Sequence, residues 1–362
     1  MHVAVIADRC SRRGGADQHL LDVLGELAAD PTIGRLELVV GIDDGTARPP
    51  CPHRVVAGIE ARDAHPLAKE LDLHEFDVVH LHNVVNPWLL ERASSWPALA
   101  TVQDHRPFCP GQGKLQLGGR RCARRFAPEL CAPCLGDQSY AERMVALTER
   151  RLAALAQLPR VVVLSAYMKG ELVDVGLARE RLAVIPPFVD LSALKANAKV
   201  QIEPCVLFVG RLVEAKGIDD AITAHAASQT TLPLVFAGTG SQRQHLERRG
   251  QRVTGWLDRS ALGAHYRAAR ALLMPSRWQE PFGIVGLEAL SFGVPVAAYD
   301  SGGIREWHPG QGLVPWGDVQ ALGRALASLL REAPTVDIPA DFHTKAQMAK
   351  LRETYRAVAE KG

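Results

Sequence analysis

The chain has 362 residues, of which 47% are hydrophobic and 23% are charged, and its formal net charge is +2. This length is enough for two domains of ordinary size, and the apolar content supports large buried cores. Because the charges nearly balance, no overall field favours nucleic acid as a partner.

The N-terminal residues MHVAVIADRC lack the charged start, the long apolar segment and the cleavage site of a signal peptide. No apolar run approaches the ~20 residues that a membrane helix needs. We therefore expect a cytoplasmic location. The seven cysteines, an odd number, are typical of a reducing compartment rather than of a disulfide framework.

Apolar strands alternate with helical patterns through the first half of the chain. The expected strands are 2–7, 36–42, 77–82, 98–103, 160–165 and 182–188, and the first is followed by a helix over 16–29. This alternation predicts a doubly wound parallel sheet. Gly14 and Gly15 form the turn before that helix, whose first amides could face a phosphate, although paired glycines are a weak signal.

The alternation of apolar strands and helical patterns stops over 188–204, which we interpret as a linker, and resumes after it. Strands are expected at 205–210, 232–238, 252–256, 271–276 and 294–300, and helices from Lys216 and over 242–249, 260–270, 283–292, 318–330 and 344–361. We predict an N-terminal domain over 1–187 with a cysteine-rich insertion at 105–138, a C-terminal domain over 188–342, and a C-terminal helix over 343–362. The fold class is α/β, with two Rossmann-like domains facing a ligand-binding cleft.

Two carboxylates stand in the apolar run 277–290. The 283–292 helix is apolar on nearly every side, so Glu288 needs hydrogen-bond donors from the protein or from a ligand. Glu280 lies in the loop before this helix, where an anion would meet the helix N-terminus. Arg211 after one strand and Lys216 at the next helix start can clamp a diphosphate, because Arg forks two oxygens and Lys adds a point charge.

The ordered set G-R-x4-K-G and E-x7-E resembles retaining glycosyltransferases of family 4, which have the B-type glycosyltransferase fold. The resemblance extends to DVVHLHN (77–83), FAGTGSQR (236–243) and SGGIREW (301–307). It implies a nucleotide-sugar donor, UDP- or GDP-linked, bound mainly by the second domain, and a saccharide or lipid-linked acceptor bound mainly by the first. It also implies a role in glycan or cell-surface polysaccharide synthesis, with no metal or other cofactor required for the chemistry.

The resemblance implies a role for each donor-side residue. Arg211 and Lys216 would hold the diphosphate, aided by the amides of Phe282 and Gly283. Glu280 would contact sugar hydroxyls. Glu288 would accept hydrogen bonds from the ribose, which would explain a carboxylate among apolar neighbours.

On the acceptor side, the family usually has a histidine at the end of the 98–103 strand, and this chain has Gln103 there. His105 follows two residues later, and an extended backbone would point both side chains to the same side, so His105 could replace the family histidine as a catalytic residue. His80 and His82 either line the acceptor side or are satisfied structural histidines. Trp256 either stacks on a nucleobase or packs in the core.

Four cysteines in the insertion, Cys109, Cys122, Cys131 and Cys134, have the spacing C-x12-C-x8-C-x2-C. Four thiolates can hold a structural Zn²⁺, with iron–sulfur ligation a lesser alternative and four reduced thiols or an oxidisable pair another. Such a metal would organise a loop beside the cleft. Basic clusters at 118–125 and 243–252 are either solvated faces or contacts with an anionic membrane surface or acceptor.

Two other functions remain open on this fold. A sugar-nucleotide epimerase or hydrolase would act on the donor without an acceptor. A non-catalytic nucleotide-sugar-binding module, with Gln103 marking lost catalysis, would bind the donor and leave it intact.

Overall fold

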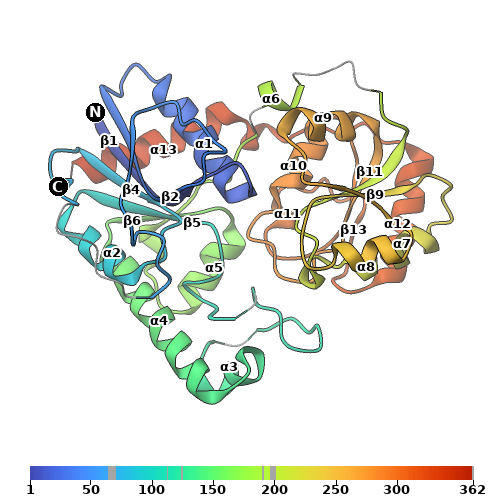
Figure 1. The fold of residues 1–362 in the computed structure, drawn as a ribbon, viewed down its shortest axis with the longest axis horizontal. Coiled ribbons are helices and arrows are strands. Elements are labelled where there is room, and N and C mark those ends of the chain that lie inside the picture. Colours follow the sequence, from blue (N-terminus) through green and yellow to red (C-terminus); the bar gives the residue numbers. More distant parts are fainter. Residues whose placement is uncertain (64–70, 112, 124, 190, 196–200, 361–362) are drawn as a thin grey trace. The chain divides into compact units, whose positions relative to one another are not determined.

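The computed structural model describes residues 1–360 except 64–70, 112, 124, 190 and 196–200. The chain divides into two compact units (Figure 1). Unit 1 comprises Met1–Leu117, Cys122–Phe188 and Thr344–Gly362, and unit 2 comprises Gly118–Arg121 and Val189–His343. The C-terminal segment therefore returns to the N-terminal unit.

Unit 1 is built on a seven-stranded parallel sheet with the order β3-β2-β1-β4-β5-β6-β7. The central strands β1, β4 and β5 are almost wholly buried, which explains why they are nearly continuous apolar runs rather than alternating ones. The strands are β1 (His2–Cys10), β2 (Arg35–Asp43), β3 (His53–Val55), β4 (Val78–His82), β5 (Ala98–Val102), β6 (Arg160–Val163) and β7 (Leu182–Val184).

Two of the longer helices of unit 1 begin after a residue whose side chain caps a free backbone amide. Asp137 caps α4 by accepting from Tyr140 N, and Ser165 caps α5 by accepting from Met168 N. Gly14, the residue before α1, has an extended backbone and gives no side-chain cap. The helices are α1 (Gly15–Ala28), α2 (Pro87–Arg92), α3 (Pro128–Leu135), α4 (Gln138–Gln157), α5 (Ala166–Asp174) and α13 (Thr344–Ala359).

The core of unit 1 joins both ends of the chain. Leu20 and Leu24 of α1 pack with strand residues such as Val5, and Leu351 and Tyr355 of α13 belong to the same buried cluster. The C-terminal helix is thus part of the unit 1 core.

Unit 2 repeats the design with a six-stranded parallel sheet of order β10-β9-β8-β11-β12-β13. Its strands are β8 (Cys205–Val209), β9 (Leu234–Ala237), β10 (Arg252–Gly255), β11 (Ala269–Met274), β12 (Val296–Tyr299) and β13 (Leu313–Val314). Its helices are α6 (Leu191–Lys195), α7 (Ile218–Ala227), α8 (Arg243–Arg248), α9 (Arg259–Ala268), α10 (Ile284–Ser291), α11 (Ile304–Trp307) and α12 (Val319–Glu332). Phe208, Phe236 and Leu273 belong to its buried core.

The predicted pair of Rossmann-like α/β domains is confirmed by these two sheets. The predicted helix start at Lys216 is wrong, because Lys216 ends a 3-10 turn (Glu214–Lys216) and α7 begins at Ile218. The sequence patterns also omitted the 20-residue helix α4 and the short edge strands β3 and β13. The predicted cleft between the domains stays a prediction.

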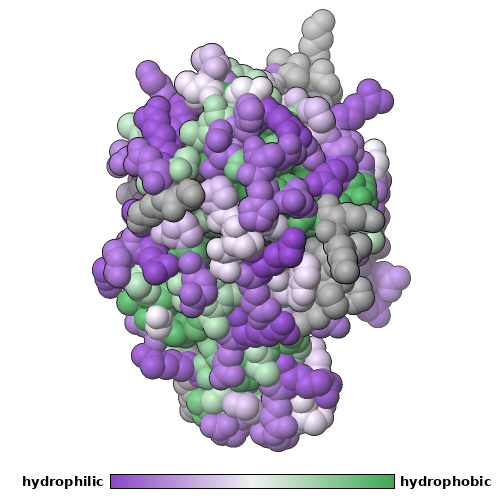
Figure 2. Space-filling view, turned by 90° about the vertical axis from the view of Figure 1, so that its left-hand side faces the viewer, coloured by the Kyte–Doolittle hydropathy of each residue, from purple (hydrophilic) through white to green (hydrophobic). Residues whose placement is uncertain are grey.

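Among the described residues, no helix is long and apolar enough to cross a membrane. The face drawn in Figure 2 is largely hydrophilic, with apolar residues scattered over it. Large hydrophobic side chains that stand exposed include Leu117 and Leu130. Both lie in the predicted cysteine-rich insertion.

Candidate active site

Lys216 and Glu280 meet at the carboxyl end of the unit 2 sheet. Lys216 Nζ lies 2.6 Å from Glu280 Oε1, and Ser276 Oγ donates to the same oxygen. The side chains of Lys216 and Glu280 are 18% and 5% exposed, so this ion pair is well shielded from water. The structure therefore brings together two of the four residues of the predicted donor set.

Backbone contacts hold the two loops that carry this pair. Ala215 O accepts from Arg277 N and Trp278 N, at 3.0 Å each. Gly217 has a left-handed backbone, and a Cβ there would lie 1.9 Å from Pro275 O. A residue other than glycine would push the loops apart, and the left-handed backbone of Gly217 delays the start of α7 until Ile218.

The glycines of the segment 301–304 support the Glu280 loop from the other side. Gly303 N donates to Glu280 O at 2.8 Å, and Ser301 Oγ donates to Trp278 O at 2.6 Å. A Cβ at Gly302 would lie 2.1 Å from Glu280 O, and the φ of Gly302 is +57°. The loop is thereby fixed from both sides by backbone contacts.

Glu280 is buried yet stays ionised. Burial opposes the charge, but attraction to Lys216 and hydrogen bonds from Lys216 and Ser276 outweigh it, so the pKa of Glu280 is held below its usual value. A carboxylate in this state accepts hydrogen bonds and does not donate a proton.

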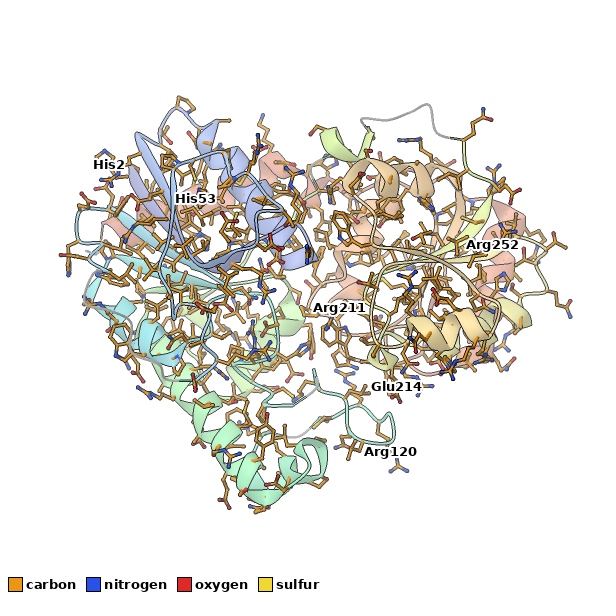
Figure 3. All side chains as sticks on the ribbon, viewed as in Figure 1. His2, His53, Arg120, Arg211, Glu214 and Arg252 are labelled. Carbon is orange, nitrogen blue, oxygen red and sulfur yellow. The ribbon has the colours of Figure 1, made fainter. Side chains whose placement is uncertain are left out.

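Arg211 contacts the same aromatic ring, that of Trp278, as Lys216 does. Arg211 follows β8 and is exposed, and Figure 3 shows it with Glu214 in the loop between β8 and α7. Its guanidinium carbon lies 5.3 Å from the Trp278 ring centroid, and Lys216 Nζ lies 4.5 Å from the same centroid. Both predicted diphosphate-binding cations thus contact one indole.

The N-terminus of α10 lies directly after Glu280. Gly283 takes a left-handed backbone as the residue before α10, and a Cβ there would lie 2.6 Å from Met274 Cε. Phe282 is 1% exposed, and its carbonyl accepts from Trp307 Nε1 at 2.7 Å. The backbone amides of Phe282 and Gly283, for which the sequence predicts anion binding, lie in this segment, and that role stays a prediction.

Glu288 sits inside α10 with two donors supplied by the protein. Arg259 Nη1 lies 2.7 Å from Oε1, and Tyr266 OH lies 2.8 Å from Oε2. Burial, together with the neighbouring Glu288 carboxylate, raises the pKa of Tyr266 well above its usual value, so its hydroxyl remains a donor. The burial of Glu288 therefore needs no ligand, contrary to the explanation expected from the sequence.

In unit 1, buried histidines and Gln103 form a polar cluster at the carboxyl end of the sheet. Gln103 Nε2 lies 2.7 Å from His19 Nδ1 and 2.6 Å from His82 Nε2. His80 has partners on both ring nitrogens, Tyr355 OH and Thr101 Oγ1, at 2.7 Å each. Burial lowers the pKa of His19 to about 4 and that of His80 to about 3, so these rings are neutral.

His105 does not share the surroundings of Gln103. The chain turns after β5, and the carbonyl of His105 accepts from Phe108 N and Cys109 N at 2.8 and 2.7 Å. The ring of His105 packs edge-on against Phe108, at 5.3 Å between centroids. Because this backbone is not extended, the geometric basis for placing His105 beside Gln103 is absent, and its catalytic role stays a prediction.

Asp8, near the end of β1, is a further ionisable group in this part of unit 1. Its Oδ2 lies 3.9 Å from Arg106 Nη1, while Arg106 Nε donates to Asp104 Oδ2 at 2.8 Å. Burial raises the pKa of Asp8 to about 7, partly offset by Arg106. At the nearby start of α1, Gly14 and Gly15 precede Asp17, whose pKa burial raises to about 6.

The four cysteines of the insertion lie close enough to influence one another. Burial raises the pKa of Cys131, and the neighbouring Cys109, Cys122 and Cys134 raise it further. Cys109 Sγ accepts from Lys114 N at 3.4 Å. No group of three or more His, Cys, Asp or Glu among the described residues is arranged to hold a metal ion, so the structure gives no support to the predicted zinc site.

Comparison with protein families identifies the chain. A family model described as Glycosyltransferase Family 4 matches residues 3–193, more than half of the chain. The chain belongs to glycosyltransferase family 4. A second model, described as Glycosyl transferases group 1, matches residues 192–347, so the two together cover both units of this glycosyltransferase.

Relatives of this glycosyltransferase include a glycogen synthase of Mycobacterium tuberculosis, 36% identical over 164 residues that cover 41% of this chain and 38% of that protein. The match thus spans well under two thirds of that relative. Among solved structures, sucrose-phosphate synthase from Thermosynechococcus elongatus has a TM-score of 0.65 at 19% identity and full coverage of both chains. Anabaena HepE in complex with UDP has a TM-score of 0.64 at 17% identity, covering 100% of this chain and 98% of that one. These two likenesses show the B-type fold alone.

Sequence reasoning missed several site residues of the glycosyltransferase. Trp278 and Ser276 lie in the SRWQEP loop, where only Glu280 drew attention. Arg259 follows Asp258, whose side chain accepts from Ala261 N and caps α9. Because aspartate is a common helix cap, the sequence could have predicted that a helix begins at Arg259. Its pairing with Glu288 across 29 positions carried no local signal.

Proposed function

We propose that this glycosyltransferase transfers a hexosyl unit, with retention of configuration, from a nucleotide-diphosphate sugar to a saccharide or lipid-linked acceptor. One observation carries the proposal: Arg211 and Lys216 converge on Trp278 beside Glu280 and the N-terminus of α10. Two cations and free amides at the carboxyl end of a parallel sheet suit a diphosphate.

In the proposed reaction, the bond between the sugar's anomeric carbon and the diphosphate breaks through an oxocarbenium-like state. Arg211, Lys216 and the amides of Phe282 and Gly283 stabilise the departing diphosphate, which is the largest contribution the protein makes. The acceptor hydroxyl attacks from the face that the diphosphate leaves, and a phosphate oxygen takes its proton. This chemistry needs no metal ion.

Donor recognition is assigned to the two glutamates. The ionised Glu280 accepts hydrogen bonds from sugar hydroxyls. Glu288, held at both oxygens by Arg259 and Tyr266, keeps a lone pair on each oxygen for the ribose hydroxyls. The UDP bound to the Anabaena neighbour supports a UDP-linked donor, with GDP as the alternative base.

Acceptor binding is assigned to the sheet edge of unit 1. His105 lies after β5 on this edge, whereas the backbone amides at Gly14 and Gly15, at the start of α1, are assigned to a phosphate of the donor. We place the enzyme in polysaccharide synthesis in the cytoplasm, at the inner face of the membrane when the acceptor is lipid-linked.

The structural zinc is a separate proposal. The four thiols at Cys109, Cys122, Cys131 and Cys134 would hold it, and Lys114 N donates a hydrogen bond to Cys109 Sγ. Its role would be to order the insertion, and it takes no part in the transfer.

The donor is tested by a thermal-shift screen of UDP, GDP, ADP, CMP and their sugar conjugates, because a ligand that binds only the native state raises the melting temperature. We expect one nucleotide family to raise it, and Glu288→Ala to abolish the shift while the matched exposed variant Glu203→Ala keeps it. The stabilising donor is then incubated with and without acceptors. Donor isomerised or hydrolysed in preference to transfer identifies an epimerase or hydrolase, and donor left intact identifies a binding module. The absence of any shift would contradict the proposed donor site.

A further inference from the structure

The indole of Trp278 lies where two like charges must be held together. Lys216 Nζ is 4.5 Å and the Arg211 guanidinium carbon 5.3 Å from its ring centroid. Both distances are within the range in which a cation is attracted to the ring face. In a site without ligand, these cations repel each other, and Glu280 neutralises only Lys216.

The position of the ring is set by the protein backbone. Trp278 N donates to Ala215 O at 3.0 Å, and Trp278 O accepts from Ser301 Oγ at 2.6 Å. The backbone that carries the indole is therefore fixed by the loops on both sides of it before any diphosphate arrives.

We propose that Trp278 is a positioning residue that holds Arg211 and Lys216 ready for the donor's diphosphate. Its ring face attracts both cations and so lowers the cost of keeping them in one place. The inference rests on the proposed function, because it assigns the cations to a diphosphate. It adds a residue that neither G-R-x4-K-G nor E-x7-E includes.

The size of the effect follows from cation–π energetics. One such contact changes an equilibrium constant by about two- to five-fold when exposed and by about thirty-fold when desolvated. Trp278 is partly buried and serves two cations. We expect loss of the ring to weaken diphosphate binding by about tenfold.

The test uses inorganic pyrophosphate, which reports on the clamp without base, sugar or turnover. Its affinity is measured by calorimetry on the full chain carrying Trp278→Leu or Trp278→Phe. The Phe variant keeps a ring and loses the indole N–H, whereas the Leu variant loses both. Trp88→Leu is the matched control, because Trp88 is equally half-buried and lies 5.8 Å from the Arg92 guanidinium carbon in unit 1.

We expect a roughly tenfold weaker affinity for Trp278→Leu, less than threefold for Trp278→Phe, and no change for Trp88→Leu. Equal losses in the Phe and Leu variants would overturn the inference, because loss of the indole N–H, and not loss of the ring face, would then account for the effect. An unchanged affinity in Trp278→Leu, or a wild-type protein that does not bind pyrophosphate, would overturn it too.

A second measurement tests the same inference without the Leu variant, in case Trp278→Leu does not fold. Fluorinated tryptophans weaken the ring's attraction for cations with little change in size. Incorporated into wild-type protein they should weaken pyrophosphate binding, and in Trp278→Phe they should have no effect; equal effects in both backgrounds contradict the inference. Failure here, with donor binding intact in the nucleotide screen, would leave the proposed function standing.

Discussion

Replacing Arg259 by alanine tests whether the protein itself satisfies the buried Glu288. The Arg259–Glu288 pair joins side chains that are 15% and 5% exposed, with 2.7 Å between Nη1 and Oε1. Removing one partner of a buried pair costs about 3–5 kcal/mol. Because Tyr266 still donates to Glu288 in this variant, we expect a cost at the lower end of that range. A cation in the first turn of α9 interacts unfavourably with the helix dipole, so removing Arg259 stabilises this helix by ~0.3–1 kcal/mol. We therefore expect Arg259→Ala to lower the free energy of unfolding of this region by about 2–3 kcal/mol.

The measurement is hydrogen exchange of peptides from α9 and α10 in the full chain, because exchange reports the opening free energy of unit 2 separately from unit 1. Arg252→Ala is the matched control: Arg252 pairs with Glu203 at 3.0 Å, but these side chains are 61% and 78% exposed. Because it is exposed, the Arg252–Glu203 pair should contribute only about 0–1 kcal/mol to the opening free energy of unit 2.

A double variant sharpens the result. Adding Glu288→Gln to Arg259→Ala removes the stranded charge, so the double variant should be more stable than Arg259→Ala alone. If Arg259→Ala costs no more than Arg252→Ala, or if Glu288→Gln gives no recovery, the view that Arg259 compensates a buried carboxylate is refuted.

Three further predictions concern Lys216, the proposed catalytic cation, one buried carboxyl and the cysteines. Lys216→Ala should lower turnover of the donor by about 10²–10³-fold with a much smaller loss of stability; unchanged turnover in a folded variant would contradict its role. Asp8 has its pKa raised from 3.8 to about 7 in the folded protein, so the folded state binds more protons between these values and Asp8 makes stability fall as pH rises through that window. Asp8→Asn should remove this fall, and urea unfolding of both proteins at pH 4 and pH 8 measures it; parallel changes in the two proteins would exclude the effect. Elemental analysis of purified protein should find about one zinc per chain, which Cys131→Ser should abolish, and wild-type protein free of zinc and iron removes the proposed site.

The local sequence predicted much of the fold because its signals are periodic. Continuous apolar runs identified β1, β4, β5, β8 and β11, and the all-round apolar character of 283–292 identified α10 as a buried helix. The short edge strands β3 and β13 gave too little pattern, with three and two residues. The α4 helix, with its many charged residues, has only a narrow buried face.

The site was predicted in part, and the limits follow from the backbone. The residues Arg211, Lys216, Glu280 and Glu288 could be selected from their order and charge. Their partners could not. Lys216 precedes α7 because Gly217 lies against Pro275 O, a contact between positions 58 residues apart that no local pattern records. The turn after β5, which separates His105 from Gln103, likewise has no periodic signal.

The sequence by itself determined the two α/β units and which charged residues stand at sheet edges, because alternation of apolar residues and glycine positions are properties of short segments. The tertiary structure alone decided that Arg259 and Tyr266 satisfy Glu288, and that Trp278 lies against both Arg211 and Lys216. These contacts depend on how neighbouring strands and their loops pack, and packing brings together residues whose separation along the chain carries no information about their distance in space.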